Sequence, residues 1–173
     1  IPLYSRNEAQ ENYKTRVWTR AYGSEVNLLI NLSHKDKKMR DIFQNLKFRK
    51  AISHAIDRER INDKVYFNLA KPMQTTVPTM NKFYKEEYAQ SYVEFNPEKA
   101  KELLDEMNLV DTNGDGHREL PDGSVFNPQL IFTTSGPVNP TKVLELVQRD
   151  LADVGINLVL KMQNRNLRDT RWS

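Results

Sequence analysis

Hydrophobic side chains recur at intervals of three and four residues over residues 47–61, with charged side chains between them. This spacing places the hydrophobic positions on one side of a helix, so it predicts an amphipathic helix over 47–61. A second helix is expected to follow over residues 62–69. The hydrophobic positions of the first helix are Phe48, Ala51, Ile52, Ala55 and Ile56.

Two more helices are predicted to begin at asparagine–proline pairs. Asn96 and Asn139 each offer a side-chain oxygen that can accept from free backbone N–H groups, and the proline that follows each of them suits the first helical turn. The expected buried side of the earlier helix comprises Ala100, Leu103, Leu104 and Met107. That of the later helix comprises Val143, Leu144, Val147 and Leu151.

The last third of the chain alternates strand and helix patterns. A hydrophobic run at 130–133 precedes the later helix, and Ile156, Leu158 and Leu160 alternate after it. Gly155 lies where this helix is expected to end, because glycine readily takes the left-handed conformation found there. Strand, helix and strand in this order predict a parallel pair joined by a right-handed crossover. The predicted fold class is therefore α/β, with packed helices and a β-α-β unit in a mixed α+β arrangement.

The N-terminal part of the chain is expected to contain little helix. The first 31 residues are predicted to be extended, and 26–31 is close to a strand that is buried on both faces. A charged, flexible stretch is expected at 33–40. Two prolines predict an irregular, extended segment over 72–80.

Composition is typical of an ordinary soluble globular domain. Of 173 residues, 38% are hydrophobic and 28% are charged, and no run reaches the roughly 18 consecutive apolar residues of a membrane span. This length suits one domain with a sizeable core, so residues 1–173 are expected to form a single domain. No targeting signal is visible at Ile1, and both ends suggest a fragment of a longer protein.

Charge and cysteine content argue against several function classes. The 26 basic and 23 acidic residues give a net charge of +3, and no basic stripe with interleaved aromatic residues is present, so nucleic acid is not an expected partner. The absence of cysteine excludes disulfides and thiolate metal sites. The three histidines fall in unrelated segments, and the sequence has no His-Glu-x-x-His, Gly-x-Ser-x-Gly or phosphate-loop motif. Catalysis therefore finds little support in the sequence.

A polar loop at 111–122 carries candidate metal ligands. Its oxygen-bearing residues follow the spacing of an EF-hand loop, and Gly116 lies where such a loop turns tightly. Position 12 is aspartate instead of the longer glutamate, and Asx turns explain the same residues without a metal. A loop without a cofactor is the expectation, and calcium is the alternative. The candidate ligands are Asp111, Asn113, Asp115, the carbonyl group of His117, Glu119 and Asp122.

Three segments, in this order, resemble the family 5 extracellular solute-binding proteins, which bind oligopeptides, dipeptides and related ligands. Residues 48–61 are similar to that family's helix signature, Arg-x-Ala-Ile/Leu-Ser-x-Ala-Ile-Asp-Arg, almost residue for residue. Residues 95–104 are similar to its proline-started helix ending in Ala-x-x-Leu-Leu, and an Asp-x-Asn-Gly-Asp-Gly loop follows. The third segment is the β-α-β unit with Thr-Ser-Gly at 134–136 and Val-Gly-Ile at 154–156.

The resemblance implies a periplasmic-binding-protein-like fold, in which two α/β lobes close on a ligand and pass it to a membrane permease. This chain would be a fragment of lobe II in the substrate-binding component of an ABC importer. The implied ligand is a peptide, with an oligosaccharide or nickel as alternatives within the family and an unrelated interaction domain as a further alternative. The implied location is extracytoplasmic, either periplasmic or as a cell-surface lipoprotein, and a monomer is expected.

Four residues are candidate ligand contacts. Thr134 and Ser135 follow a predicted strand and Asn139 begins a helix, and α/β folds bind ligands at such carboxyl ends of strands and helix starts. Asn139 serves first as a helix cap, but the resemblance implies a ligand-facing position in this turn in some relatives. It also implies that Arg171 can face a peptide carboxylate, whose two oxygens suit the guanidinium fork. A surface arginine is the alternative.

Overall fold

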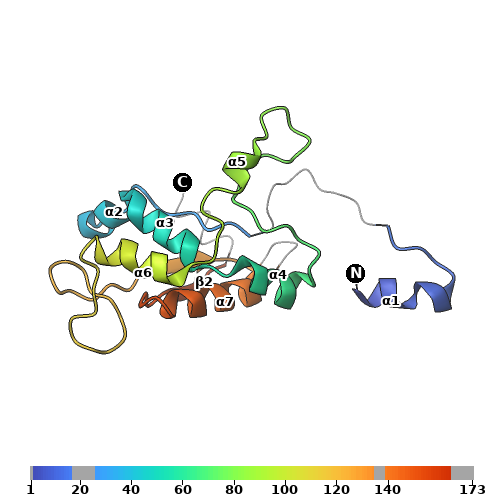
Figure 1. Ribbon diagram of the computed structural model, residues 1–173. Helices are drawn as coiled ribbons and strands as arrows, with labels where there is room; N and C mark the ends of the chain where they lie inside the picture. The colour runs from blue at the N-terminus through green and yellow to red at the C-terminus, as the bar shows by residue number, and fades with distance from the viewer. Residues whose placement is uncertain (1, 17–25, 135–138, 165–173) are drawn as a thin grey trace.

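Packed helices and two parallel strands form the body of the protein (Figure 1). The computed structural model describes residues 2–16, 26–134 and 139–164. Its elements in chain order are α1 (Pro2–Glu11), α2 (Lys37–Gln44), α3 (Leu46–Ala55), α4 (Arg58–Tyr66), α5 (Glu86–Ala89), α6 (Pro97–Asp105), β1 (Gln129–Phe132), α7 (Thr141–Ala152) and β2 (Val159–Met162).

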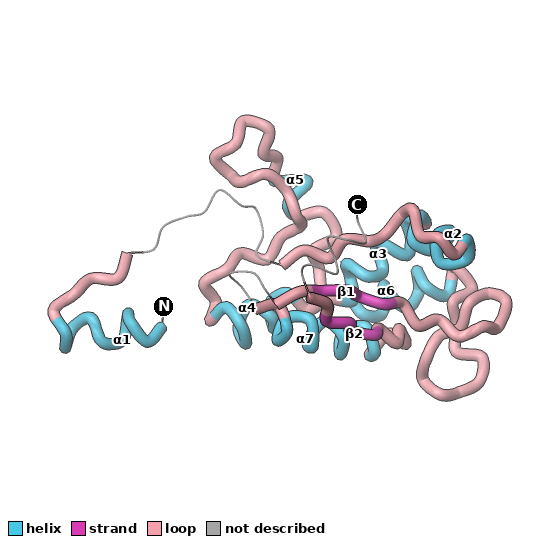
Figure 2. Tube along the Cα trace, turned by 180° about the vertical axis from the view of Figure 1, so that it is seen from behind, coloured by secondary structure: helices cyan, strands magenta, loops and turns pink. Residues whose placement is uncertain are grey.

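The β-α-β unit predicted from the sequence is confirmed. β1 and β2 pair in parallel, and α7 connects them and contacts both α3 and α4. In Figure 2, α6 and α7 lie behind the strands. The paired residues Leu130 and Leu160 pack against the core, whereas the paired residues Ile131 and Lys161 are exposed on the other face. The strand pair is therefore covered on one face by the helices that are described.

Residues 47–61, for which the hydrophobic spacing predicts one helix, belong to two helices, so that prediction is wrong. Ile56 between α3 and α4 is extended, and the Asp57 carboxylate accepts a hydrogen bond from the backbone N–H of Arg60 at 2.8 Å. An aspartate in this position satisfies a free N–H group and starts a new helix. The helix predicted over 62–69 is the later part of α4.

Asparagine side chains bind the first turns of α6 and α7, as predicted, with one difference in position. At α6, the Asn96 oxygen accepts from the backbone N–H of Lys99 at 2.9 Å. At α7 the cap position is Pro140, one residue later than predicted. Asn139 nevertheless accepts from the backbone N–H of Thr141 at 3.0 Å and from its hydroxyl group at 2.7 Å.

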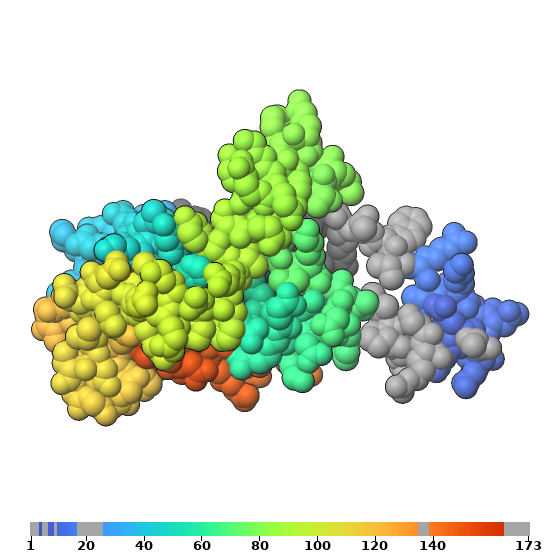
Figure 3. All heavy atoms as spheres, in the orientation of Figure 1, coloured from blue at the N-terminus to red at the C-terminus, as the bar shows by residue number. Residues whose placement is uncertain are grey.

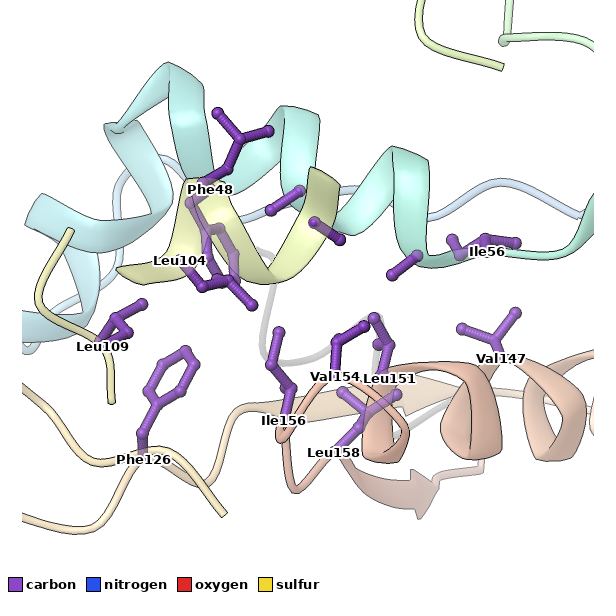
Figure 4. Close-up of a cluster of buried hydrophobic side chains, with 14 of the residues drawn as sticks. Phe48, Ile56, Leu104, Leu109, Phe126, Val147, Leu151, Val154, Ile156 and Leu158 are labelled. Atoms are coloured by element: carbon purple, nitrogen blue, oxygen red, sulfur yellow. The ribbon is translucent and has the colours of Figure 1, made fainter. Parts of the chain in front are cut away.

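One hydrophobic core joins the helices to the strands (Figure 4). Phe48 of α3 lies near Leu104 of α6, and its ring meets the Phe126 ring edge-on with a centroid distance of 5.9 Å. Full burial of such a side chain stabilises the fold by about 1.5–3 kcal/mol. The largest fully buried side chains are Phe126, Leu104, Leu109, Leu144, Ile156 and Val154.

Two expectations for the N-terminal region are wrong. α1 is helical where an extended chain is expected, and α2 begins inside the stretch 33–40 that is expected to be flexible. Asp36 caps α2 by accepting from the backbone N–H of Lys38 at 2.8 Å, so a local hydrogen bond sets this helix start.

Residues 26–31 form no strand within the described part of the chain, which corrects a further prediction. Their alternation still decides their packing, but on one face rather than two. The side chain of Leu29 is 83% exposed. The residues that pack against the core are Val26, Leu28 and Ile30.

Residues 72–95, here called the protrusion, leave the body, carry α5 and return to it (Figure 1), and atoms of this segment project from the molecule (Figure 3). The irregular start predicted for 72–80 is confirmed. At the base, the backbone N–H of Gln74 donates to the carbonyl oxygen of Ala89 at 2.8 Å. The two ends of the protrusion are therefore held close together.

Gly155 follows α7 in the left-handed conformation, as predicted, with a φ of +84°. Its carbonyl oxygen accepts from the backbone N–H of Arg118 at 2.8 Å, and Arg118 Nε donates to the carbonyl oxygen of Val154 at 2.7 Å. A Cβ atom at position 155 would lie 3.0 Å from Arg118 Cγ. Both the backbone conformation and this close approach therefore favour glycine.

The substitution Gly155→Ala is expected to lower the free energy of unfolding by about 2–3 kcal/mol, because it adds left-handed strain and displaces Arg118. The control is Gly123→Ala, where φ is +79° but nothing lies within 4 Å of the added Cβ. That variant should lose about 1 kcal/mol from strain alone. Urea unfolding followed by circular dichroism measures both losses, and equal losses would contradict the role given to Arg118.

Candidate functional site

The carboxyl ends of β1 and β2 lie side by side, because the strands are parallel and Phe132 pairs with Met162. The pairing continues past β2, where the backbone N–H of Gln163 donates to the carbonyl oxygen of Phe132 at 2.8 Å. Ligands of open parallel sheets bind beyond this edge. Thr134, the first candidate contact, is exposed there, two residues after the end of β1.

The structure places Asn139 on the same strand-to-helix connection as Thr134, and its side chain is exposed. Its oxygen is engaged with Thr141 at the start of α7. Ser135 and Arg171 lie outside the described residues, so their assignment as ligand contacts stays a prediction.

Arg58, in the helix signature, caps the end of α3. Its Nη1 atom donates to the carbonyl oxygen of Ser53 at 2.8 Å and to that of Ile56 at 3.4 Å, and its Nη2 atom donates to Ser53 Oγ at 2.9 Å. These groups lie at the negative end of the α3 dipole, which offsets the charge of the guanidinium group. Burial lowers the pKa of Arg58 from its ordinary value. Its hydrogen bonds therefore join the end of α3 to the start of α4.

The polar side of α3 also holds the protrusion. Ser53 Oγ donates to the carbonyl oxygen of Tyr92 at 2.6 Å and accepts from Gln74 Nε2 at 2.6 Å, so it contacts both ends of the protrusion. His54 Nδ1 lies 3.0 Å from the carbonyl oxygen of Glu94. These contacts give structural partners to the serine of the helix signature and to the histidine that follows it.

A buried carboxylate on α7 holds the start of α4. Asp150 is 2% exposed, accepts from the backbone N–H of Asp57 at 3.0 Å and forms an ion pair with Arg60. The hydrophobic pattern alone did not identify this contact. A signal was present, since Asp150 lies three positions after Val147 on the apolar side of α7, where a charge needs a partner.

Three carboxylates of the 111–122 loop converge. One oxygen atom from each of Asp111, Asp115 and Glu119 lies within 4.8 Å of the other two. Glu119 is 5% exposed, and its Oε2 atom accepts from the backbone N–H of Thr112 at 2.7 Å and from its hydroxyl group at 2.8 Å. Its Oε1 atom accepts from Asn113 Nδ2 at 3.0 Å.

The aspartates of this loop also accept hydrogen bonds from the loop itself. Asp111 accepts from the backbone N–H groups of Gly114 at 2.7 Å and Gly116 at 2.9 Å, and these bonds lower the pKa of Asp111. Asp115 accepts from the backbone N–H of His117 at 2.8 Å. The Asp115 bond is an Asx turn to the residue two positions on, whereas the Asp111 bonds reach three and five residues on, so carboxylate oxygens that a calcium ion would need already accept from the loop.

The structure does not bring Asp122 to these three carboxylates within the part of the chain it describes. Asp122 forms an ion pair with Lys38 and accepts from the Ser124 hydroxyl group at 2.6 Å. Hydrogen bonds from Lys38 and Ser124 lower the pKa of Asp122 well below its usual range. The candidate ligand at position 12 of the loop is therefore directed elsewhere.

Comparison with known proteins identifies one family whose model covers the whole chain. The model of the bacterial extracellular solute-binding proteins, family 5, middle part, matches residues 1–173. Heme-binding protein A of Haemophilus influenzae is 31% identical over 116 residues, which are 66% of this chain and 19% of that protein. This chain therefore spans about a fifth of the length of that curated relative.

Solved structures agree with this match. The oligopeptide-binding protein OppA superposes with a TM-score of 0.88 at 29% identity, over 98% of this chain and 26% of its own. A periplasmic oligopeptide-binding protein of Thermotoga maritima with bound mannohexaose gives a TM-score of 0.57 at 31% identity, over 70% of this chain and 23% of its own. The mixed α/β fold predicted from the sequence is thus the periplasmic-binding-protein fold of these neighbours.

The substitution Arg60→Ala is expected to lower the free energy of unfolding by about 2–4 kcal/mol, because it leaves the Asp150 carboxylate buried without its cation. Lys37→Ala is the control, since the Lys37–Asp41 pair at 2.6 Å is exposed and should contribute less than about 1 kcal/mol. Urea unfolding at neutral pH measures both. Losses of the same size would contradict a special role for Asp150.

Calorimetric titration with calcium chloride is expected to show no saturable heat at millimolar calcium. The reason is that the loop's own N–H groups already bind Asp111, Asp115 and Glu119. Saturable heat that disappears in Glu119→Gln would overturn this expectation and assign a metal to the loop.

Proposed function

This chain belongs to the bacterial extracellular solute-binding proteins of family 5, and on that premise we propose that it is part of the substrate-binding component of an ABC importer. The protein would capture its solute outside the membrane by closure of two lobes and deliver it to a permease. Residues 1–173 would form one domain within lobe II. The parallel β1–β2 pair supports this proposal, because its carboxyl edge leads into both segments that carry candidate contacts.

A peptide is the solute that we propose. The high structural similarity to an oligopeptide-binding protein over nearly the whole chain supports it. An oligosaccharide is the second candidate, because a neighbour of similar identity holds mannohexaose. Nickel is a further alternative within the family.

We propose a location and an assembly on the same premise. Members of this family are extracellular solute-binding proteins. Among the described residues, no helix combines the length and apolar character needed to cross a membrane. We place the protein outside the cytoplasmic membrane, either in a periplasm or as a lipoprotein, and as a monomer that contacts the permease. The family and fold are those of substrate-binding proteins, so binding without catalysis completes the proposal.

Recognition of a peptide carboxylate by Arg171 is the part of the proposal that a single substitution tests. In the full-length protein, Arg171→Ala is expected to weaken binding of a free-acid peptide by about tenfold or more, because a charge-assisted pair contributes about 1.5–3 kcal/mol. A peptide found by thermal-shift screening against peptides and oligosaccharides serves as the ligand, and calorimetry measures its affinity.

Two controls separate this effect from a general loss of structure. Lys142→Ala changes an exposed cation on α7 and should leave affinity unchanged. The same peptide with an amidated C-terminus should bind wild type and Arg171→Ala equally. An equal loss of affinity for the acid and the amide would contradict carboxylate recognition. If only oligosaccharides stabilise the protein in the thermal-shift screen, the proposed solute is an oligosaccharide instead of a peptide.

A further inference from the structure

Asn113 and Gly114 form the one Asn-Gly pair in the sequence, and both are exposed. Asparagine is a chemically labile residue. Its carboxamide carbon can be attacked by the backbone nitrogen of the next residue, and a following glycine puts no side chain in the way. The pair therefore marks a position where the chain can change its own covalent structure.

We propose that Asn113 is a deamidation site that the folded loop holds closed. In the open loop, the Gly114 nitrogen loses its proton to solvent and forms a bond to Asn113 Cγ, and the carboxamide nitrogen leaves as ammonia. The resulting five-membered imide takes up water and opens to aspartate or isoaspartate. One water molecule is consumed and one ammonia is released, and no oxidant or cofactor is needed.

Hydrogen bonds in the folded loop hold each group that must move. The Gly114 N–H donates to Asp111 Oδ1 at 2.7 Å, so the attacking nitrogen is engaged. Asn113 Nδ2 donates to Glu119 Oε1 at 3.0 Å, and Asn113 Oδ1 accepts from the backbone N–H of Asp115 at 2.8 Å. The carboxamide is thus fixed at both of its polar atoms.

Charge in the loop opposes the same reaction. Negative charge develops first on the Gly114 nitrogen and then on the oxygen bound to Asn113 Cγ. The converging oxygens of Asp111, Asp115 and Glu119 would repel that charge, because like charges at short range raise the energy of the ionised state. Folding therefore slows the reaction, and opening of the loop permits it.

The product would prevent the loop from closing again. An aspartate at position 113 would place a carboxylate oxygen where Asn113 Nδ2 now donates to Glu119, which is 5% exposed. Two carboxylates at that distance repel each other, and isoaspartate also lengthens the backbone. Once Asn113 is modified, the loop therefore stays open, and the modified fraction reports how often the loop has opened.

Peptide mapping by mass spectrometry tests the proposal on the full-length protein at mildly alkaline pH. Conversion at Asn113 is expected to be at least roughly tenfold slower in the folded protein than in a synthetic peptide of residues 108–120, since a protected group reacts through local opening. Asp111→Ala should speed conversion in the folded protein. Asn96 and Asn127 are internal controls, because the prolines after them have no N–H group to attack with.

Three results would overturn the proposal. One is equal rates in the folded protein and the peptide, and another is an Asp111→Ala variant of native circular dichroism that converts no faster than wild type. The third concerns the product. Asn113→Asp should lower the thermal midpoint of unfolding, whereas Asn127→Asp, at an exposed position, should not. Equal midpoints for these two variants would contradict the claim that the product keeps the loop from closing.

Discussion

The buried carboxylate of Asp150 is the interaction on which the arrangement of the helices depends. It lies on the helix that connects the two parallel strands, yet it accepts from the backbone of Asp57 and pairs with Arg60 at the start of α4. A carboxylate at this depth is tolerated because both partners reach it. The contact therefore fixes the break between α3 and α4, which Asp57 caps, against the β-α-β unit.

The rest of the helix signature continues this arrangement outward. Asp57 starts α4, Arg58 closes the end of α3, and Ser53 binds both ends of the protrusion. These three polar residues of the signature are thus explained by contacts within the described part of the chain. The proposed ligand contacts lie elsewhere in the sequence, after the carboxyl ends of the two strands.

Periodicity and local capping rules accounted for much of the fold. The β-α-β unit, the start of α6 at Asn96 and the left-handed Gly155 could be predicted because each depends on neighbouring residues or on a regular spacing. The periodicity of 47–61 ran through the break after Ala55, although Asp57 offered a local cap signal there, and it could not reveal the contact with Asp150, 93 residues from Asp57 in sequence. In the candidate site, spacing suggested Asp122 as a ligand, but its long-range ion pair with Lys38 directs it elsewhere. Thr134 and Asn139 share one connection, as the strand–helix order implied.

The closed base of the protrusion has a consequence for how this part of the chain can vary. Its two ends are joined by the bond from Gln74 to Ala89 and by the contacts of Ser53. The packing of the body therefore does not depend on the number of residues between these ends. The entropy of closing a loop grows slowly with its length, by about 0.6 kcal/mol for each doubling. The protrusion can therefore be shortened, extended or replaced by another sequence while α3 and α6 keep their packing, which makes it a natural insertion point in this fold.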